Sequence, residues 1–331
     1  MNLAARPVPS EGAPRSLVSP VGAPGQGDPN LPSGRTPMTQ LPEPFTYRRV
    51  DADGVSINVA VGGQGDPVLL LHGYPQTHLM WRDVAPDLAR DHTVVVPDLR
   101  GYGASDKPAP DDDARNYGKR AMAADQVAVM QSLGFDRFAL VGHDRGARVS
   151  HRLVLDHPDA VTRLALLDIV PTRHVFANVD RALAFGYFHW FFLATGGDVP
   201  ETLLRGAPEF WIRTMVERLL APGVTMEPEV MDHYIAAFSD PATIAATTAD
   251  YKAGAGIDLT DDEETWEAGQ RIECPTLVLW GEHGFVGKNY DPLAVWREYG
   301  RDVTGRAMPS GHFIPEEAPQ ETLAELRRWL S

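Results

Sequence analysis

Short, mainly apolar runs recur along the chain and predict the strands of a sheet. They lie at residues 68–71, 93–96, 138–141, 161–167 and 276–279. Apolar runs of this length are typical of strands that are buried on both faces. Helix-compatible segments separate them, such as residues 119–133, which precede Gly134 at a position where helices often end. This alternation predicts an α/β fold with a mostly parallel central sheet and helices on both of its faces.

Two different patterns occupy the amino-terminal part of the chain. Residues 1–44 hold ten prolines and five glycines, and they contain no apolar segment like that of a secretory signal. This composition is typical of a disordered or extended tail. From residue 45 the pattern changes, because segments 45–50 and 55–61 flank Asp53-Gly54, a pair that favours a tight hairpin turn. The folded part is therefore expected to begin with a hairpin.

The strand–helix alternation stops between about residues 171 and 256. This stretch is helix-like and rich in aromatic residues, most densely at residues 185–192. An insertion between two strands that covers one end of the sheet is the simplest interpretation. We therefore expect a core made of residues 45–170 and 257–331, with residues 171–256 forming a helical cap.

Composition and charge exclude several classes of function. The 331-residue chain has 30 Lys and Arg against 45 Asp and Glu, so its formal charge is −15, and its pI is near 5.1. This acidity argues against binding to nucleic acid or to membranes through basic residues, and the chain lacks the roughly 20 consecutive apolar residues of a membrane span. The single cysteine, Cys274, excludes an intrachain disulfide and a cysteine-rich zinc site. We expect a cytoplasmic protein. The acidic run at residues 261–264 is expected to form a solvated face.

The most informative segment joins a predicted strand to a predicted helix. After residues 138–141 the chain reads Gly142-His-Asp144-Arg-Gly146, and residues 147–157 are compatible with a helix. In this setting the G-x-D-x-G pattern matches the tight turn called a nucleophile elbow, in which small flanking residues let the central side chain project. The alternative is a plain turn with Asp144 as a helix N-cap.

Asp144 stands where such elbows often carry a serine, and the difference decides the chemistry. A serine attacks carbonyl carbons, whereas a carboxylate can displace a leaving group from a saturated carbon and form an ester with it. Water must then cleave that ester. Asp144 therefore predicts a route through an alkyl ester on the enzyme, which opens a carbon–halogen bond or an epoxide.

Hydrolysis of such an ester needs a general base and an acid that orients it. His312 follows a strand-like segment at residues 303–307, and the chain order nucleophile, acid, histidine is that of α/β-hydrolases. Two positions compete for the acid: Asp168 at the end of one predicted strand and Glu282 after the next. We favour Asp168 and retain Glu282 as the alternative. Plainer roles are open to both partners, a turn cap for Asp168 and a surface histidine for His312.

Attack of water on the ester creates an oxyanion, which backbone N–H groups usually stabilise. One candidate donor is the N–H of Arg145, which follows the nucleophile. The other is the N–H of Tyr74, in the segment His72-Gly-Tyr-Pro after the strand at 68–71. The alternative is that this segment is only a turn.

Arg145 and Arg148 lie three residues apart at the start of the predicted helix and share one face. Cations at a helix amino terminus oppose the helix dipole, so their presence suggests an anion that compensates them. A substrate carboxylate held by two guanidinium groups would serve, which makes a small anionic molecule the expected partner. The alternative is that one arginine pairs with Asp144 or with another acid of the protein.

A departing halide would need hydrogen-bond donors. His189 and Trp190 in the predicted cap, and Tyr251 near its end, offer imidazole, indole and phenol groups. An aromatic stripe such as residues 185–192 is more often the core of a lid, so both interpretations stay open.

In combination, these segments resemble the fluoroacetate dehalogenases of the α/β-hydrolase superfamily. The resemblance covers residues 45–331 and rests on residues 72–77, 97–103, 142–146, 148, 188–190, 250–251 and 311–313. It implies hydrolysis of haloacetates, with Asp144 as nucleophile, His312 as base and Asp168 as its acid. It implies no metal or organic cofactor and, as in many members of the family, a homodimer.

The same resemblance implies roles for the remaining candidates. Arg145 and Arg148 would bind the substrate carboxylate, and His189, Trp190 and Tyr251 would bind the halide. The main alternative is an epoxide hydrolase with the same aspartate nucleophile. Epoxide hydrolases and haloalkane dehalogenases commonly carry Trp where this chain has Arg145, which speaks against both. A non-catalytic binding protein of this fold often lacks part of the triad, whereas all three candidates are present here.

Overall fold

An eight-stranded sheet forms the centre of the structure, a computed structural model that describes residues 38–331. The strands are β1 (Thr46–Ala52), β2 (Val55–Gly63), β3 (Asp66–Leu71), β4 (His92–Pro97), β5 (Phe138–His143), β6 (Val161–Leu167), β7 (Thr276–Gly281) and β8 (Val303–Met308). Their spatial order is β1-β2-β4-β3-β5-β6-β7-β8. β2 runs antiparallel to β1 and β4, and the pairs from β4 to β8 are parallel. The predicted mostly parallel sheet is confirmed.

The amino-terminal hairpin forms where Asp53-Gly54 predicted it. Both residues have positive φ, 52° for Asp53 and 84° for Gly54, as a tight two-residue hairpin turn requires. A tail is predicted over residues 1–44, and residues 1–37 of it lie outside the described residues. Its boundary is corrected, because the Leu41 side chain is buried and the Leu41 N–H donates to the Tyr47 hydroxyl at 2.7 Å.

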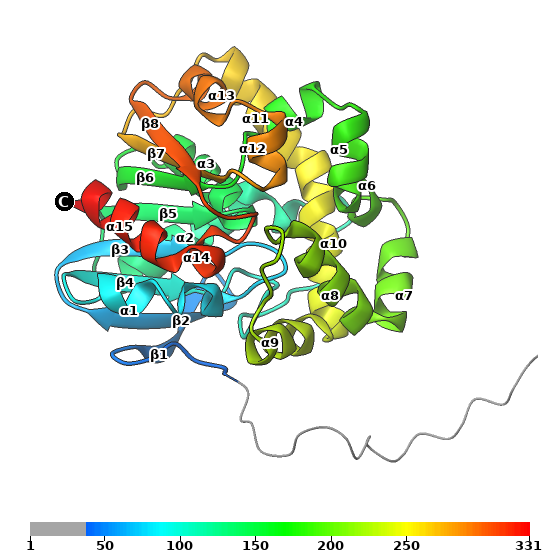
Figure 1. The fold of residues 1–331 in the computed structure, drawn as a ribbon, viewed down its shortest axis with the longest axis horizontal. Helices are drawn as coiled ribbons and strands as arrows, with labels where there is room; N and C mark the ends of the chain where they lie inside the picture. The colour runs from blue at the N-terminus through cyan, green and yellow to red at the C-terminus, as the bar shows by residue number, and fades with distance from the viewer. Residues whose placement is uncertain (1–37) are drawn as a thin grey trace, which may run out of the picture. The chain divides into compact units, whose positions relative to one another are not determined.

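Helices cover both faces of the sheet (Figure 1). The helices outside the long insertion are η1 (His78–Trp81), α1 (Ala85–Leu88), η2 (Arg115–Tyr117), α2 (Lys119–Ser132), α3 (Arg145–Asp156), α12 (Phe285–Asn289), α13 (Pro292–Tyr299), α14 (Ile314–Glu317) and α15 (Pro319–Leu330). Leu69 of β3 packs in one hydrophobic cluster with residues of α2 and α3, and its neighbour Leu70 packs in a second cluster with residues of α1 and α15. Burial on both faces explains the continuous apolar runs, since such strands have no solvated face.

The segment between β6 and β7 is entirely helical in its regular structure. It contains α4 (Thr172–Ala177), α5 (Arg181–Gly186), α6 (Phe188–Leu193), α7 (Val199–Gly206), α8 (Pro208–Leu219), α9 (Pro228–Phe238), α10 (Pro241–Ala255) and α11 (Ile257–Glu267). Figure 1 shows α5 to α10 grouped beside the carboxyl-terminal ends of the parallel strands. Among residues 38–331, every helix is too short or too polar to cross a membrane.

The solvated face predicted for the acidic run at 261–264 is wrong for its first two residues, whereas Glu264 is exposed as predicted. Asp261 and Asp262 are buried at 7% and 9% exposure. Asp261 pairs with Arg120 of α2 at 3.3 Å, and Asp262 lies 3.9 Å from Arg152 of α3. Asp261 and Asp262 therefore join α11 to α2 and α3, because the arginines that face them lie on those helices.

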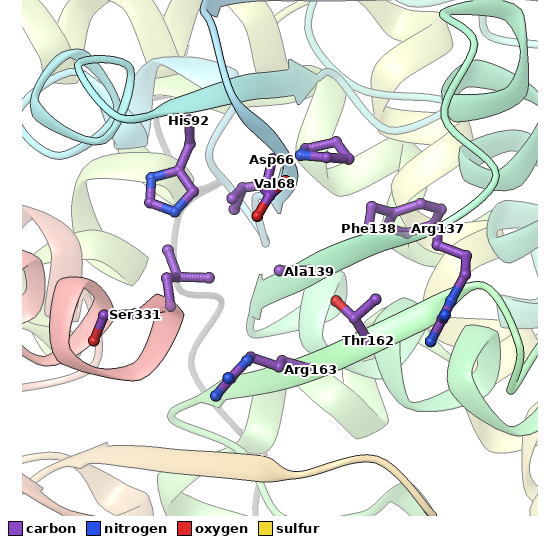
Figure 2. A pocket seen from close by; sticks show the side chains of 11 residues that line it. Asp66, Val68, His92, Arg137, Phe138, Ala139, Thr162, Arg163 and Ser331 are labelled. Atoms are coloured by element: carbon purple, nitrogen blue, oxygen red, sulfur yellow. The ribbon is translucent and has the colours of Figure 1, made fainter.

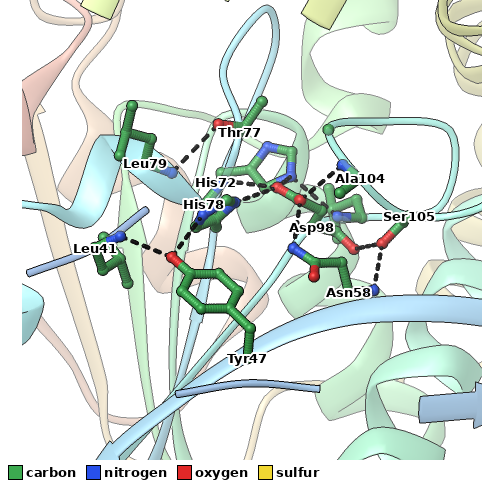
Figure 3. Close-up of polar contacts among 12 residues, drawn as sticks. Leu41, Tyr47, Asn58, His72, Thr77, His78, Leu79, Asp98, Ala104 and Ser105 are labelled. Carbon is green, nitrogen blue, oxygen red and sulfur yellow. Dashed lines mark hydrogen bonds and ion pairs between the residues drawn. The ribbon is translucent and has the colours of Figure 1, made fainter. Parts of the chain in front are cut away.

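A buried carboxylate, Asp98, ties the end of β4 to neighbouring segments (Figure 3). It accepts hydrogen bonds from His78 N and Nδ1 at 2.9 and 2.8 Å, and from Asn58 Nδ2 and Ala104 N, both at 2.9 Å. His78 Nε2 lies 3.0 Å from the Tyr47 hydroxyl, so the same ring also links Asp98 to β1. Burial alone would raise the pKa of Asp98, but the charge and hydrogen bonds of His78 outweigh it and hold that pKa well below its ordinary value.

Asp98→Asn is expected to lower the free energy of unfolding by about 3 kcal/mol, because an amide cannot satisfy all four donors. Since the folded-state pKa is depressed, the stability that this carboxylate contributes is present above its unfolded-state pKa and is lost as the pH falls. Urea unfolding at neutral and acidic pH measures both effects, and the variant should lose less stability than wild type on acidification. Asp112→Asn, at an exposed position, is the control and should change stability by less than about 0.5 kcal/mol. Equal losses in the two variants would contradict the role of Asp98.

Candidate active site

Asp144 occupies the sharp turn between β5 and α3. Its backbone has φ 47° and ψ −116°, outside the regions that residues with a side chain usually adopt. Space requires the flanking glycines: a Cβ on Gly142 would lie 2.4 Å from Ser150 Oγ, and a Cβ on Gly146 would lie 2.3 Å from the His72 carbonyl oxygen. The start of α3 therefore packs directly against the chain that leaves β3, as the G-x-D-x-G pattern indicated.

The Asp144 carboxylate is buried beside the loop that follows β3. The Tyr74 N–H donates to Asp144 Oδ2 at 2.9 Å, the contact expected of an oxyanion donor. Gly73 is so close that a Cβ there would lie 2.8 Å from the same oxygen. The other predicted donor, the Arg145 N–H, makes no hydrogen bond to Asp144 within residues 38–331. Asp144 Oδ2 is thus held in place, while Oδ1 receives no hydrogen bond from the described residues.

His312 and Asp168 meet at the carboxyl-terminal ends of the strands, where Asp144 also lies. His312 Nδ1 lies 2.6 Å from Asp168 Oδ2, and Asp168 Oδ1 accepts from the Gly281 N–H at 2.9 Å. The alternative acid, Glu282, is half-exposed and lies 3.3 Å from His283 Nε2. The structure therefore brings Asp168, and not Glu282, to the histidine.

His312 is placed to act as a base beside Asp144. Because Asp168 accepts a hydrogen bond from Nδ1–H, Nε2 of the neutral imidazole carries a lone pair. Nε2 lies 3.9 Å from Asp144 Oδ1. That separation is longer than a hydrogen bond. Burial disfavours the imidazolium, but the hydrogen bond and charge of Asp168, together with the charge of Asp144, raise the pKa of His312 above its ordinary value.

Glu317, which the sequence did not single out, holds the loop that carries His312. Its carboxylate accepts from the backbone N–H groups of Gly311 at 2.9 Å, Phe313 at 2.8 Å and Ala221 at 2.7 Å. The one signal in the sequence was an acidic residue soon after the candidate histidine. The glutamate replaces the partners that a loop backbone would otherwise find in water.

Arg145 does not present the free fork that was expected for substrate binding. Its Nε donates to Asp250 Oδ2 at 2.9 Å, and its Nη2 contacts Asp250 Oδ1 and donates to the Asp250 carbonyl oxygen at 2.6 Å. The guanidinium carbon lies 4.3 Å from the centre of the Tyr251 ring. The expectation of two free forks is corrected: Arg145 pairs with another acid of the protein, and within residues 38–331 its Nη1 alone makes no hydrogen bond.

Arg148 is buried and forms no ion pair with a carboxylate of the described residues. Its Nη1 donates to the Val170 carbonyl oxygen and to Thr172 Oγ1, both at 3.1 Å, and its buried Nε has no partner among residues 38–331. The guanidinium carbon lies 4.4 Å from the Trp190 ring centre. Burial and the charge of Arg145 lower the pKa of Arg148. An anion beside it would stabilise this cation.

Two of the three predicted halide-binding side chains contact Tyr74, and the third packs against one of them. The His189 ring stacks on the Tyr74 ring at 6.3 Å, and the Tyr251 ring meets it edge-on at 5.5 Å. Trp190 packs against Tyr251 at 6.3 Å, and all four side chains are buried. Burial lowers the pKa of His189 to about 3, so its imidazole is neutral and carries one N–H. The Tyr74 hydroxyl also contacts Trp211 Nε1 of α8, and no pattern in the chain predicts this contact.

A separate cavity of about 430 Å³ lies at the amino-terminal ends of the parallel strands (Figure 2). Its lining includes Asp66, His92 and Phe138, which stand at the starts of β3, β4 and β5. None of the candidate site residues borders it. The candidate site instead follows the carboxyl ends of β5 and β6, where ligands of open α/β sheets usually bind.

The family model for the alpha/beta hydrolase fold matches residues 66–319. The chain belongs to this family. A fluoroacetate dehalogenase of Burkholderia sp is 43% identical to this hydrolase over 290 residues, which cover 87% of this chain and 95% of that protein. A soluble epoxide hydrolase of Corynebacterium sp. (strain C12) is 32% identical over 281 residues, covering 83% of this chain and 94% of that protein.

Solved structures share the fold along nearly the whole described chain. A crystal structure from Nostoc sp PCC 7120, described as an alpha/beta hydrolase, is 50% identical with a TM-score of 0.85. It covers 87% of this hydrolase and 98% of its own chain. The relatives thus support a hydrolase, and they include both dehalogenase and epoxide hydrolase names.

Gly146→Ala is expected to lower the free energy of unfolding by about 3 kcal/mol, because the new Cβ would meet backbone and no flexible side chain can give way. Urea or thermal unfolding measures the loss. Gly196→Ala is the matched control, since no atom lies within 4 Å of its Cβ position. Equal stability of the two variants would show that α3 has room to move away from β3, contrary to the packing described.

Proposed function

We propose that this hydrolase cleaves the carbon–halogen bond of haloacetates and releases glycolate and halide. The observation that carries the proposal is Arg148, a buried cation without a carboxylate partner among the described residues, one helical turn after the Asp144 carboxylate. A small substrate that is itself a carboxylate would supply the missing anion. The similarity to a fluoroacetate dehalogenase supports the same choice.

In the first step, Asp144 Oδ1 attacks the substrate carbon that carries the halogen. A new C–O bond forms, the carbon–halogen bond breaks, and the halide leaves with the bonding electron pair. Oδ1 is the attacking oxygen because the Tyr74 N–H already holds Oδ2. Burial raises the pKa of Asp144, but the charge of His312, with those of Arg145 and Arg148, outweighs it and keeps the carboxylate ionised.

The departing halide would accept hydrogen bonds from the side chains around Tyr74. His189, Trp190 and Tyr251 offer three donors, and the neutral state of His189 leaves its N–H uncharged. Donors fixed in a buried site stabilise developing negative charge without reorganising at the moment of reaction.

In the second step, His312 Nε2 takes a proton from water, and the hydroxide attacks the ester carbon of Asp144. The negative charge develops on Oδ2, which the Tyr74 N–H already contacts at 2.9 Å. Asp168 stabilises the imidazolium that forms, through the 2.6 Å contact with Nδ1. When the intermediate collapses, the bond between the ester carbon and the glycolate oxygen breaks, and that oxygen takes the proton back from His312 Nε2. The Asp144 carboxyl group then loses its own proton to solvent, which restores the carboxylate.

Epoxide hydrolysis is the second candidate, since the soluble epoxide hydrolase of Corynebacterium is 32% identical to this chain. The ring centres of Tyr74 and Tyr251 lie 5.5 Å apart in an edge-on arrangement, and both side chains carry phenol groups that could protonate an epoxide oxygen. A neutral epoxide would leave Arg148 without an anion, which is why the haloacetate is preferred.

The direct test is to trap the ester in His312→Asn. The variant keeps Asp144 but lacks the base, so incubation with chloroacetate should add one carboxymethyl group to the peptide that contains Asp144. Mass spectrometry of a digest measures the adduct. His283→Asn, at a half-exposed histidine, is the control and should turn over without an adduct. No adduct on His312→Asn, with an active wild-type enzyme, would contradict the mechanism.

Halide release from the wild-type enzyme decides the substrate. Fluoride from fluoroacetate and chloride from chloroacetate are measured in parallel, with Asp144→Asn as the inactive control. Release of either ion supports the proposal, and fluoride release would extend it to the stronger bond. Release of neither, with hydrolysis of a simple epoxide, would replace it by the second candidate.

The titration of His312 offers an independent prediction. Its pKa is raised above the ordinary value of 6.5, in part by the charge of Asp144. Asp144→Asn removes that charge, as ester formation does, so the pKa of His312 should fall in this variant. NMR titration of the imidazole measures both values. In wild-type enzyme, hydrolysis of the ester should accelerate as the pH rises through the lower pKa, because the base must be neutral. An unchanged pKa in Asp144→Asn would contradict the coupling.

A further inference from the structure

Four donor groups surround the carboxylate of Asp250, which takes no part in the proposed reaction. It precedes Tyr251 in α10 and is completely buried. Arg145 donates from Nε at 2.9 Å and contacts it through Nη2, the Tyr102 hydroxyl donates at 2.7 Å, and Lys119 Nζ forms a further contact. These donors come from α3, the loop after β4, and the start of α2, so Asp250 joins α10 to three parts of the core.

The contacts leave Arg145 a single orientation. Nε and Nη2 are both used by Asp250, and the face of the guanidinium rests on the Tyr251 ring. On another side, a Cβ built on Gly254 would lie 3.3 Å from Nη2 and 3.4 Å from Nη1. Only Nη1 remains without a hydrogen bond among residues 38–331.

The surrounding charges balance except at one arginine. Lys119 Nζ also lies 3.4 Å from Asp258 Oδ2, so two buried carboxylates face the two cations Lys119 and Arg145. Arg148 is outside this group and has no carboxylate partner among the described residues. The pairing thus neutralises Arg145 while leaving the charge of Arg148 for a ligand.

We propose that Asp250 is a positioning residue that determines the preference for carboxylate substrates. It fixes Arg145 so that Nη1 alone meets the substrate carboxylate, while Arg148 supplies the uncompensated charge. The inference rests on the proposed function, because it names how that substrate is recognised. The two arginines then contribute differently to binding of the substrate carboxylate. Arg145 offers one nitrogen of a guanidinium that Asp250 neutralises, and Arg148 offers a full positive charge.

If Asp250 acted only through its charge, replacing it would change KM in the direction opposite to the loss of a positioning contact. Asp250 is negative and repels an anionic substrate, so removing its charge would by itself lower KM for a haloacetate. Losing the positioning contact lets the Arg145 side chain rotate, which raises KM. The direction of the change therefore separates the two roles.

The experiment compares Asp250→Asn with Asp125→Asn in the full-length enzyme. Asp125 is the acid of another buried pair, held by Arg100 Nε at 2.6 Å, and neither residue hydrogen-bonds to a site residue. Asp250→Asn should raise KM for chloroacetate about tenfold and change kcat less than about threefold. The kcat/KM for chloroacetamide, which has no charge, should change less than about threefold, and Asp125→Asn should leave the ratio of the two substrates unchanged.

Tyr102→Phe keeps the test valid if Asp250→Asn does not fold. It removes one donor to Asp250 without changing any charge, and it should raise KM for chloroacetate about threefold. Thermal unfolding of every variant identifies effects of lost stability. An unchanged or lower KM in both variants overturns the positioning role, as do equal losses for chloroacetate and chloroacetamide.

Acetate binding separates this inference from the proposed reaction. Tryptophan fluorescence follows it, because Trp190 lies against Arg148. If the wild-type enzyme turns over no haloacetate but Asp250→Asn weakens acetate binding about tenfold, the reaction is wrong and the positioning role stands. If the wild-type enzyme binds no acetate, the positioning role is overturned as well.

Discussion

The close approach of α3 to the chain that leaves β3 is the constraint on which the site depends. Gly146 lies against the carbonyl oxygen of His72, and this contact forces the turn in which Asp144 takes a φ of 47°. The same approach places the Tyr74 N–H on Asp144 Oδ2. A strained backbone of this kind costs about 1–3 kcal/mol and persists only where the surrounding packing fixes it. Here the two-sided core around the sheet supplies that packing.

Burial of charge is the second organising feature. An unpaired buried charge costs several kcal/mol, so the structure gives most of these groups a partner. Asp168 pairs with His312, and Asp250 pairs with Arg145. Arg148 is the exception among the site cations within residues 38–331, and its surroundings lower its pKa. A substrate that brings its own negative charge would complete the set. The electrostatics of the site are thus linked to the class of molecule that it is proposed to bind.

Local features could be predicted from the sequence, and so could the pairing of His312 with Asp168, because the order nucleophile, acid, histidine is typical of one fold. Other long-range pairings could not be predicted. The hairpin at Asp53-Gly54 and the elbow at Asp144 depend on residues next to one another, so their patterns are visible in the chain. Arg145 and Asp250 are 105 residues apart, and nothing in the sequence shows that α10 brings them together. The burial of Asp261 and Asp262 could not be predicted for the same reason, since their arginine partners lie on α2 and α3.

A single turnover in water labelled with heavy oxygen tests the central claim most directly. With enzyme in excess over chloroacetate, the hydroxyl oxygen of the first glycolate comes from Asp144, so the product should be unlabelled. The label should instead appear in the Asp144 carboxylate, because water attacks the ester carbon of the enzyme. Labelled glycolate from the first turnover would mean that water attacks the substrate directly, and the account of Asp144 as nucleophile would be wrong.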